Sequence, residues 1–315
     1  MELIPDTINL DEYMQDEPGE HRVLPASDWT NEVIDHFHKP DNSPKVRLPW
    51  RKTHGDFHFR PSEVTLWAGI NGHGKSQIVG QVVHGLSEQR QKTALASLEM
   101  RPKLTMGRMV RQAFGGDMPP ADYITRYGKW TDGKLWVYDH VGSSDARTIA
   151  AVIRYAVDKF GVQHFVVDNL MKVVQGDQGE KAYNEQKNFV NTLCTIARDT
   201  GCHIHLVLHV KKLDKETDLP SKFDIKGSGA ITDLVDNVFI VWRNKAKEAA
   251  MRMGDDYSPD DPDCLLILDK QRNGETEGRY RLYFDHASMQ YLEDRNDLPK
   301  HCKAEIGVSI EEVDF

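Results

Sequence analysis

Residues 69–76 read GINGHGKS and constrain the fold more than any other stretch of the chain. They match the pattern G-x-x-x-x-G-K-[ST], in which glycines let the backbone turn back and point its amide N–H groups at a chain of phosphates. An apolar run, residues 63–70, comes before the loop, and a stretch of helical periodicity begins at Lys75. The helix N-terminus also attracts phosphate. The sequence therefore predicts a nucleotide-binding loop rather than an ordinary glycine-rich turn.

The loop also predicts which atoms meet the nucleotide. The Lys75 ammonium is expected to reach the β- and γ-phosphates, and the Ser76 hydroxyl is expected to ligate Mg²⁺. Further contacts are expected from the rest of the loop, namely Gly69, Asn71, Gly72, His73 and Gly74. The expected cofactors are ATP, or a dNTP such as dTTP, and Mg²⁺. The motif alone indicates only nucleotide binding, because kinases, GTPases, transporters and motors share it.

After the loop, short apolar runs alternate with longer amphipathic stretches. The apolar runs are TALASL, LWVYD, HFVVD, HIHLVLH, NVFIVW and CLLILDK. This alternation predicts an α/β fold with a mostly parallel central sheet flanked by helices. The last part of the chain differs, because residues 264–294 contain strand-like runs joined by Asn-Gly and Ala-Ser. These turns predict C-terminal antiparallel strands added to the sheet edge.

The net charge of −9 is concentrated at the two ends of the chain. The first twenty residues hold seven acids and no Lys or Arg, and residues 304–315 hold four acids and no base. Without these eleven acids, 38 remain against 40 Lys and Arg. The body is therefore nearly neutral, and the overall charge does not exclude a polyanionic ligand. We predict an acidic N-terminal tail or linker over residues 1–28, a body over 29–293 and an acidic C-terminal tail over 294–315.

The cysteines and the apolar runs bear on the compartment. The four cysteines form no CxxC pair and lie in or beside apolar runs, which predicts buried thiols rather than zinc ligands or disulfides; they are Cys194, Cys202, Cys264 and Cys302. No apolar run reaches the roughly eighteen residues of a membrane span, and residues 1–13 lack the pattern of a signal peptide. A cytoplasmic location without membrane partners is expected.

Two carboxylates follow apolar runs, where doubly wound sheets place their chemistry. Asp168 ends HFVVD, which is the place of a second magnesium contact acting through a bound water. Glu99 follows TALASL, where a carboxylate faces the γ-phosphate and orients a water for attack. Taken alone, Glu99 is equally typical of an exposed residue at the end of a strand.

Five motifs then occur in the order of a known family: ASLEM, MGRMV, VVDNL, GSGAITDLVDNVFIVWRN and LDKQRNG. Over residues 60–293 they resemble the C-terminal motor domain of the DnaB-like replicative helicases, a RecA-like P-loop NTPase. The resemblance is greatest to the phage helicase-primase and mitochondrial Twinkle branch. No primase region or zinc-binding cysteine cluster precedes the motor in this sequence.

The resemblance implies roles for residues around the nucleotide. Lys75 and Ser76 become the phosphate and magnesium residues, Glu99 the catalytic base and Asp168 the second magnesium contact. His209, which ends HIHLVLH, matches the residue that senses the γ-phosphate and couples it to the DNA-binding loop. The bacterial branch usually has Gln there, so His209 indicates the phage and mitochondrial branch.

Three basic residues match later motifs of the family. Arg243 in VWRNK matches a basic residue near the nucleotide. Lys270 and Arg272 in LDKQRNG match the pair that the family inserts into the neighbouring subunit's site, where a cation stabilises charge on the transferred phosphoryl group. In isolation, this pair is equally typical of an ordinary charged hairpin.

The histidines of HIHLVLH allow a further interpretation. His203, His205 and His209 lie on one face of the expected strand, as metal ligands would. No Cys or carboxylate completes a set within that strand, and inward histidines often only satisfy backbone groups.

Two polar loops supply the expected DNA-binding residues, which are Lys172, Lys211, Lys212, Lys215 and Lys222, with Lys181 and Lys226 beside them. The family places its DNA-contacting loops at these two positions. The acidic residues Asp214, Glu216 and Asp218 make a merely solvated loop an alternative for the second of them. In a ring of six or seven copies, even two lysines per chain would line a central channel around single-stranded DNA.

We interpret the chain as an ATP hydrolase that couples hydrolysis to DNA unwinding. The resemblance implies a homo-oligomeric ring with nucleotides at the subunit interfaces, and 5′ to 3′ movement along the DNA. The alternatives are a RecA-like recombinase that forms filaments, and an ATP-switched loader without turnover. Residues 10–14 are expected to be either a linker helix that packs on the next subunit or disordered. The acidic end, residues 309–315, resembles tails that contact a polymerase or primase in phage or plasmid replication.

Overall fold

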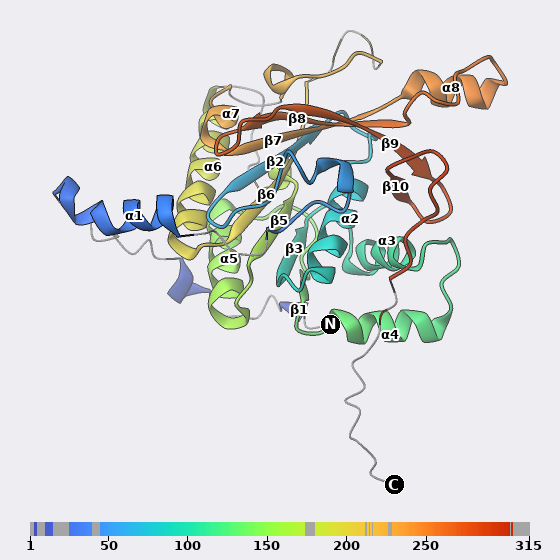
Figure 1. Ribbon diagram of the computed structural model, residues 1–315. Coiled ribbons are helices and arrows are strands. Elements are labelled where there is room, and N and C mark those ends of the chain that lie inside the picture. The colour runs from blue at the N-terminus through green and yellow to red at the C-terminus, as the bar shows by residue number, and fades with distance from the viewer. Residues whose placement is uncertain are drawn as a thin grey trace.

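The computed structural model describes residues 3–4, 10–14, 25–39, 45–173, 180–211, 213, 215, 217–225, 229–302 and 304. Within them the chain forms one ten-stranded sheet with helices on both faces (Figure 1). The strands are β1 (Leu3–Ile4), β2 (Val64–Gly69), β3 (Thr93–Ser97), β4 (Leu135–Tyr138), β5 (His164–Asp168), β6 (His203–His209), β7 (Asn237–Arg243), β8 (Cys264–Gln271), β9 (Gly278–Asp285) and β10 (Gln290–Leu292). The helices are α1 (Thr30–His38), α2 (Lys75–Glu88), α3 (Pro102–Phe114), α4 (Ala121–Thr131), α5 (Ala146–Phe160), α6 (Glu180–Thr200), α7 (Ala230–Leu234) and α8 (Lys245–Met253).

The strand order is β1-β4-β3-β5-β6-β2-β7-β8-β9-β10. All neighbouring pairs from β1 to β7 are parallel, and β7 to β10 are joined by antiparallel pairs. This confirms the predicted α/β class with a mostly parallel sheet and C-terminal antiparallel strands. The carboxyl ends of β2, β3, β5 and β6 therefore lie along one edge, where ligands bind in such sheets.

The core lies on both faces of the sheet. In β2, Leu66 and Ala68 belong to the core formed with α5 and α6, whereas Trp67 belongs to the core formed with α2 and α3. Successive strand residues point to opposite faces, so a strand covered on both sides is apolar at most positions on both faces. This explains why β2, β3 and β5 are mainly apolar runs in the sequence and do not alternate between apolar and polar residues.

Parts of both predicted tails pack against the body. Leu3–Ile4 pair with β4 at the sheet edge, and Tyr13 donates a hydrogen bond to Asp158 of α5 at 2.8 Å. Residues 10–14 thus pack against the body of the same chain, and Asp11–Tyr13 form the short 3-10 helix η1. At the other end, Cys302 and Ala304 are buried. Helix α1 extends away from the sheet (Figure 1).

All four cysteines are buried and none is in a disulfide, as predicted. Among the described residues, no helix has both the length and the apolar character needed to cross a membrane.

Three histidines form a buried polar network beneath the aromatic core. His164 Nδ1 lies 3.1 Å from His205 Nε2, and the indole of Trp67 donates to His205 Nδ1 at 3.2 Å. His203 contacts the Thr65 hydroxyl at 2.9 Å through Nε2. Among the residues that the structure describes, no cluster of possible metal ligands includes these histidines. Burial lowers the pKa of each, to about 4 for His203, so the rings are neutral in the folded chain.

This network makes stability depend on pH. The folded pKa values lie below the ordinary value near 6.5, so the unfolded chain takes up protons first as the pH falls. The contribution is complete above about pH 6.5 and declines towards the folded pKa, about 4 for His203. Urea unfolding is expected to show a loss of roughly 1.4 kcal/mol per histidine between about pH 7.5 and about pH 5.5.

The matched variants are His203→Asn in the network and His286→Asn on the surface. His203→Asn should have a weaker pH dependence than the wild type, whereas His286→Asn should keep it. An unchanged pH dependence in His203→Asn would show that protonation of this network does not control acid stability.

Candidate nucleotide-binding site

Glycine is required by the path of the loop between β2 and α2. Gly72 and Gly74 have φ values of 76° and 87°, which are in the left-handed region. A Cβ at Gly74 would lie 2.0 Å from the Tyr291 hydroxyl oxygen, and one at Gly69 would lie 2.4 Å from the Val241 carbonyl oxygen. The loop backbone thus passes close to β7 and β10, and larger residues would push it away from its position.

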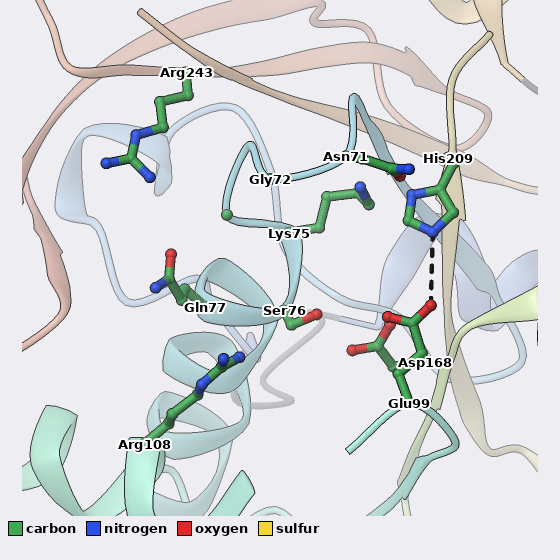
Figure 2. Close-up of a pocket in the computed structure, with 11 residues that line it drawn as sticks. Asn71, Gly72, Lys75, Ser76, Gln77, Glu99, Arg108, Asp168, His209 and Arg243 are labelled. Carbon is green, nitrogen blue, oxygen red and sulfur yellow. Dashed lines mark ion pairs between the residues drawn. The ribbon is translucent and has the colours of Figure 1, made fainter. Parts of the chain in front are cut away.

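The loop forms one wall of a cavity of about 350 Å³ at the carboxyl edge of the sheet (Figure 2). The cavity brings together most of the predicted nucleotide residues. Its lining is Asn71, Gly72, Gly74, Lys75, Ser76, Gln77, Glu99, Arg108, Asp168, His209 and Arg243.

Two predicted loop contacts lie elsewhere. Gly69 is the last residue of β2, and the His73 ring is fully buried. His73 Nδ1 accepts a hydrogen bond of 3.0 Å from the backbone N–H of Arg243. The structure therefore gives His73 a contact that ties the loop to β7.

Lys75 is held inside the cavity by the loop itself. Its Nζ donates to the carbonyls of Gly69 at 2.9 Å and Ile70 at 3.0 Å. Burial lowers the pKa of Lys75 to about 8, although the charges of Asp168 and Glu99 act in the opposite direction. A phosphate would favour the charged form of this ammonium.

Asp168 and Ser76 offer hard oxygen ligands side by side. Asp168 is only 7% exposed, and burial raises its pKa. A hydrogen bond with Ser76 and the charges of Lys75 and Arg108 lower it, whereas Glu99 adds to the upward shift. A buried carboxylate beside a hydroxyl suits Mg²⁺, which prefers oxygen ligands. These two residues could therefore hold the predicted magnesium ion.

Asn169 connects Glu99 to His209. Its amide nitrogen lies 2.5 Å from Glu99 Oε1 and 3.0 Å from His209 Nε2, and the residue is 1% exposed. The two hydrogens of an amide can serve both acceptors at once. Glu99 Oε1 and His209 Nε2 themselves lie 3.8 Å apart. The carboxylate and the imidazole are thus joined through a buried side chain whose role was not predicted from the sequence, although it directly follows Asp168.

Two arginines lie across the cavity from the carboxylates in this view (Figure 2). Arg243 Nε is 3.1 Å from Glu248 Oε2, and its guanidinium lies over the Phe284 ring. Arg108 comes from α3 and was not identified from the sequence, although it lies within the MGRMV motif. In the sequence, the only indication of a role for Arg108 is that it is a single basic residue within an otherwise apolar helical motif.

Lys270 and Arg272 lie away from this cavity. Lys270 Nζ donates to the carbonyl of Thr232, within α7, at 2.6 Å and to that of Val235, just beyond the end of α7, at 2.8 Å. Arg272 forms an ion pair of 3.0 Å with Asp236, which also accepts a hydrogen bond from the backbone N–H of Val64. Val64 begins β2, whereas the phosphate loop follows its other end. The basic pair is therefore at the opposite edge of the sheet from its own chain's cavity.

The predicted DNA-binding lysines follow the strands that carry Asp168 and His209. Lys211 and Lys215 are exposed, whereas the Lys222 ammonium donates to the Asp269 carbonyl at 2.9 Å and lies 3.5 Å from Glu277. Lys172 ends the 3-10 helix η4 (Leu170–Lys172) after β5. Lys212, Lys226 and the acidic residues 305–315 lie outside the described residues.

Phe223, in the second of these loops, is 81% exposed and was not identified from the sequence. In the sequence, the only indication of a role for Phe223 is that it is an aromatic residue in a lysine-rich polar loop.

Two curated proteins resemble the chain over its body. The replicative DNA helicase DnaB of Treponema pallidum (strain Nichols) is 25% identical over 228 residues, which are 69% of this chain and 48% of that protein. The DNA helicase/primase of Enterobacteria phage T3 is 24% identical over 204 residues, which are 59% of this chain and 36% of that protein. The chain thus spans about half, or less, of the length of these relatives.

Two solved structures share the fold. The ATPase domain of G40P superposes with a TM-score of 0.72 at 15% identity, covering 86% of this chain and 99% of that one. A DnaB-like replicative helicase, from a structure that describes its interactions with primase, superposes with a TM-score of 0.69 at 15% identity, covering 85% and 68%. These likenesses confirm the predicted RecA-like fold.

The family model of the DnaB-like helicase C terminal domain matches residues 52–293, which include the phosphate loop, both strand-end carboxylates and the C-terminal basic pair. This match covers well over half of the chain, and it confirms the resemblance drawn from the five motifs. The chain therefore belongs to the DnaB-like helicase C-terminal domain family.

Proposed function

We propose that the chain is an ATP-hydrolysing ring motor that moves along single-stranded DNA, 5′ to 3′, and unwinds duplex at a replication fork. The observation that carries the proposal is the cavity that unites Lys75, Ser76 and Asp168 with the Glu99–Asn169–His209 chain. A nucleotide switch needs only the residues that bind the phosphates, whereas a motor also needs a catalytic base and a connection from the nucleotide to the DNA-binding loop.

In the proposed hydrolysis, the loop N–H groups and Lys75 hold the phosphates in place. Glu99, which is 41% exposed at its side chain, orients a water and accepts its proton. A magnesium ion, when bound by Ser76 and Asp168, neutralises charge that develops on the phosphate oxygens. Arg108 and Arg243 add positive charge on the other side of the cavity.

The coupling to DNA passes through His209. This residue ends β6, and the loop with Lys211 and Lys215 begins directly after it. Because Asn169 joins Glu99 to His209, a change at the γ-phosphate alters the hydrogen bond at the root of that loop. Nucleotide hydrolysis would then shift the loop by a small step between two arrangements.

Two features support the proposed assembly of several copies. First, α1 extends from the body, and Trp29, Val33 and Ile34 on it or directly before it are each 50% exposed (Figure 1). Exposed apolar residues on one helix favour a protein partner, and we assign that partner to the next copy of the chain. The linker role proposed for residues 10–14 thus moves to α1.

Second, the basic pair lies at the far edge of the sheet from its own cavity. Lys270 and Arg272 can therefore act on a nucleotide only when another copy presents its cavity to that edge. The proposed assembly is a hexamer, with a heptamer as the alternative, and nucleotides occupy the seams between copies. Single-stranded DNA then passes through the central channel.

The remaining parts of the proposal rest on the resemblance alone. The motor is assigned to residues 29–293, between the acidic segments 1–28 and 294–315. The acidic C-terminal segment is proposed to contact a polymerase or primase. ATP or a dNTP such as dTTP serves as fuel, in the cytoplasm of a bacterial host that carries a phage or plasmid.

The Glu99→Gln substitution tests the motor directly. Glutamine has nearly the size of glutamate but cannot accept the proton of the attacking water. Nucleotide hydrolysis stimulated by single-stranded DNA is therefore expected to fall by roughly 10²–10⁴-fold, while nucleotide binding remains. Phosphate release and binding of a fluorescent nucleotide provide the two readouts. Asp139→Asn is the matched control, because Asp139 also follows a strand but does not line the cavity.

The same preparations separate the alternatives. A motor should also unwind a forked duplex with ATP, and Glu99→Gln should not. Hydrolysis in Glu99→Gln at the wild-type rate, or a wild-type rate that DNA leaves unchanged, would contradict the proposal and favour a switch. DNA-stimulated hydrolysis with helical filaments and without unwinding would favour a recombinase.

Phe223→Ala tests the DNA-facing loop. Base stacking on an aromatic ring contributes about 1–3 kcal/mol, so single-stranded DNA should bind roughly 5- to 160-fold more weakly, with little change in salt dependence. Lys211→Ala should instead reduce the salt dependence, because it removes a phosphate contact. Fluorescence anisotropy at two salt concentrations measures both effects. Leu298→Ala, at a site that is 85% exposed, is the control, and equal DNA affinity of Phe223→Ala and this control would refute the assignment.

A further inference from the structure

A cluster of metal-ligand types lies apart from the nucleotide cavity. His84 and Glu88 are on the last turns of α2, and Cys302 comes from the segment after β10. One ligand atom of each lies within 4.8 Å of those of the other two. His84 Nε2 and Glu88 Oε1 are already 3.4 Å apart. The fold thus joins two residues one helical turn apart to a cysteine that is distant in sequence.

The position of Cys302 is fixed by its backbone. Its N–H donates to the Ala113 carbonyl at 2.8 Å, and its carbonyl accepts a hydrogen bond of 3.0 Å from the Tyr123 hydroxyl. Cys302 is 6% exposed and packs with α3 and α4. Hydrogen bonds on both sides of one residue hold its thiol towards α2 without any contribution from the thiol itself.

The imidazole of His84 is also held in position, because it packs against two aromatic rings. Its ring lies 6.0 Å from the Tyr127 ring and 5.5 Å from the Trp130 ring, centre to centre. Among the described residues, its buried Nδ1 has no hydrogen-bond partner. Buried polar atoms without a partner are rare in folded proteins. The protein alone therefore satisfies this ring only in part.

The ligand types and their spacing suit one cation. Imidazole, thiolate and carboxylate together favour Zn²⁺, whose tetrahedral ligand atoms lie roughly 3.5 Å apart. The present separations need a movement of only about 1 Å to reach that geometry. A cavity of about 40 Å³ borders His84 and Glu88, which is room for a water as fourth ligand.

Although burial lowers the pKa of His84, hydrogen bonds with Cys302 and Glu88 outweigh it and raise that pKa to about 9, so a metal must displace a proton from this ring. Lys300 interacts electrostatically with Glu88, and Lys134 does so with Cys302. The Lys300 ammonium donates to the Pro49 carbonyl at 2.8 Å, so it is held near the cluster by a partner of its own. A hydrogen bond with His84 and, to a smaller degree, the Lys300 charge lower the pKa of Glu88, which favours its carboxylate form.

We propose that His84, Glu88 and Cys302 bind one Zn²⁺, completed by a water. The ion ties the segment after β10 to the end of α2, the helix that begins with Lys75. The site is distinct from the oxygen ligands Ser76 and Asp168. The absence of a CxxC pair made it invisible in the sequence, because two of its ligands are not cysteines and the third is more than two hundred residues away.

Metal analysis of the full chain without an affinity tag tests the proposal. After dialysis against Zn²⁺ and then buffer, one equivalent of zinc per chain is expected. Co²⁺ in its place should give tetrahedral absorption with a thiolate charge-transfer band. Cys302→Ser and His84→Gln should abolish that band, whereas Cys194→Ser, at another buried thiol, should retain it.

Two further variants keep the result decisive. Asp168→Asn should keep the thiolate band, because the magnesium site offers oxygens only. Glu88→Gln, at a side chain that is 49% exposed, should fold and bind Co²⁺ at least tenfold more weakly. Wild-type chain that binds no zinc or gives no thiolate band overturns the proposal, and so does a band that persists in Cys302→Ser or an unchanged affinity in Glu88→Gln.

Discussion

The close approach of the phosphate loop to two other strands is the constraint on which the site depends. Gly69 lies against the Val241 carbonyl of β7, and Gly74 lies against the hydroxyl of Tyr291 in β10. These contacts fix the loop between the central strand β2 and the start of α2. Lys75 and Ser76 then lie at the carboxyl edge of the sheet, beside the side chains that end β3, β5 and β6. The antiparallel C-terminal strands therefore support the loop as well as extend the sheet.

The features that could be predicted from the sequence are local ones. A glycine pattern between a strand and a helix, and apolar runs buried on both faces, identify the loop, the sheet and the strand-end carboxylates. The features that were missed depend on which side chains the topology brings together. Asn169 matters because β3 and β6 flank β5, and His164 joins His205 for the same reason. A two-residue strand such as Leu3–Ile4 is too short to show a periodic pattern in the sequence. Packed segments were therefore included in the predicted tails.

One chain holds half of the chemistry that the proposed reaction needs. The cavity contains the phosphate loop, the proposed magnesium ligands and the proposed base, but Lys270 and Arg272 are bound to the end of α7 and to Asp236 at the other edge of the sheet. A ring would bring that edge to the next cavity. Such an arrangement makes hydrolysis depend on assembly, and it lets the loop after His209 respond to a nucleotide held between two copies.

Mixing two inactive variants tests this shared site most directly. Lys75→Ala chains lack a working cavity but keep the basic pair, and Arg272→Gln chains have the reverse defect. Each variant alone should hydrolyse little ATP in the presence of single-stranded DNA. Randomly mixed rings should regain hydrolysis, because about a quarter of their seams join an intact cavity to an intact arginine. Mixed rings without any recovery, or full hydrolysis by an isolated monomer, would contradict a site divided between neighbouring copies.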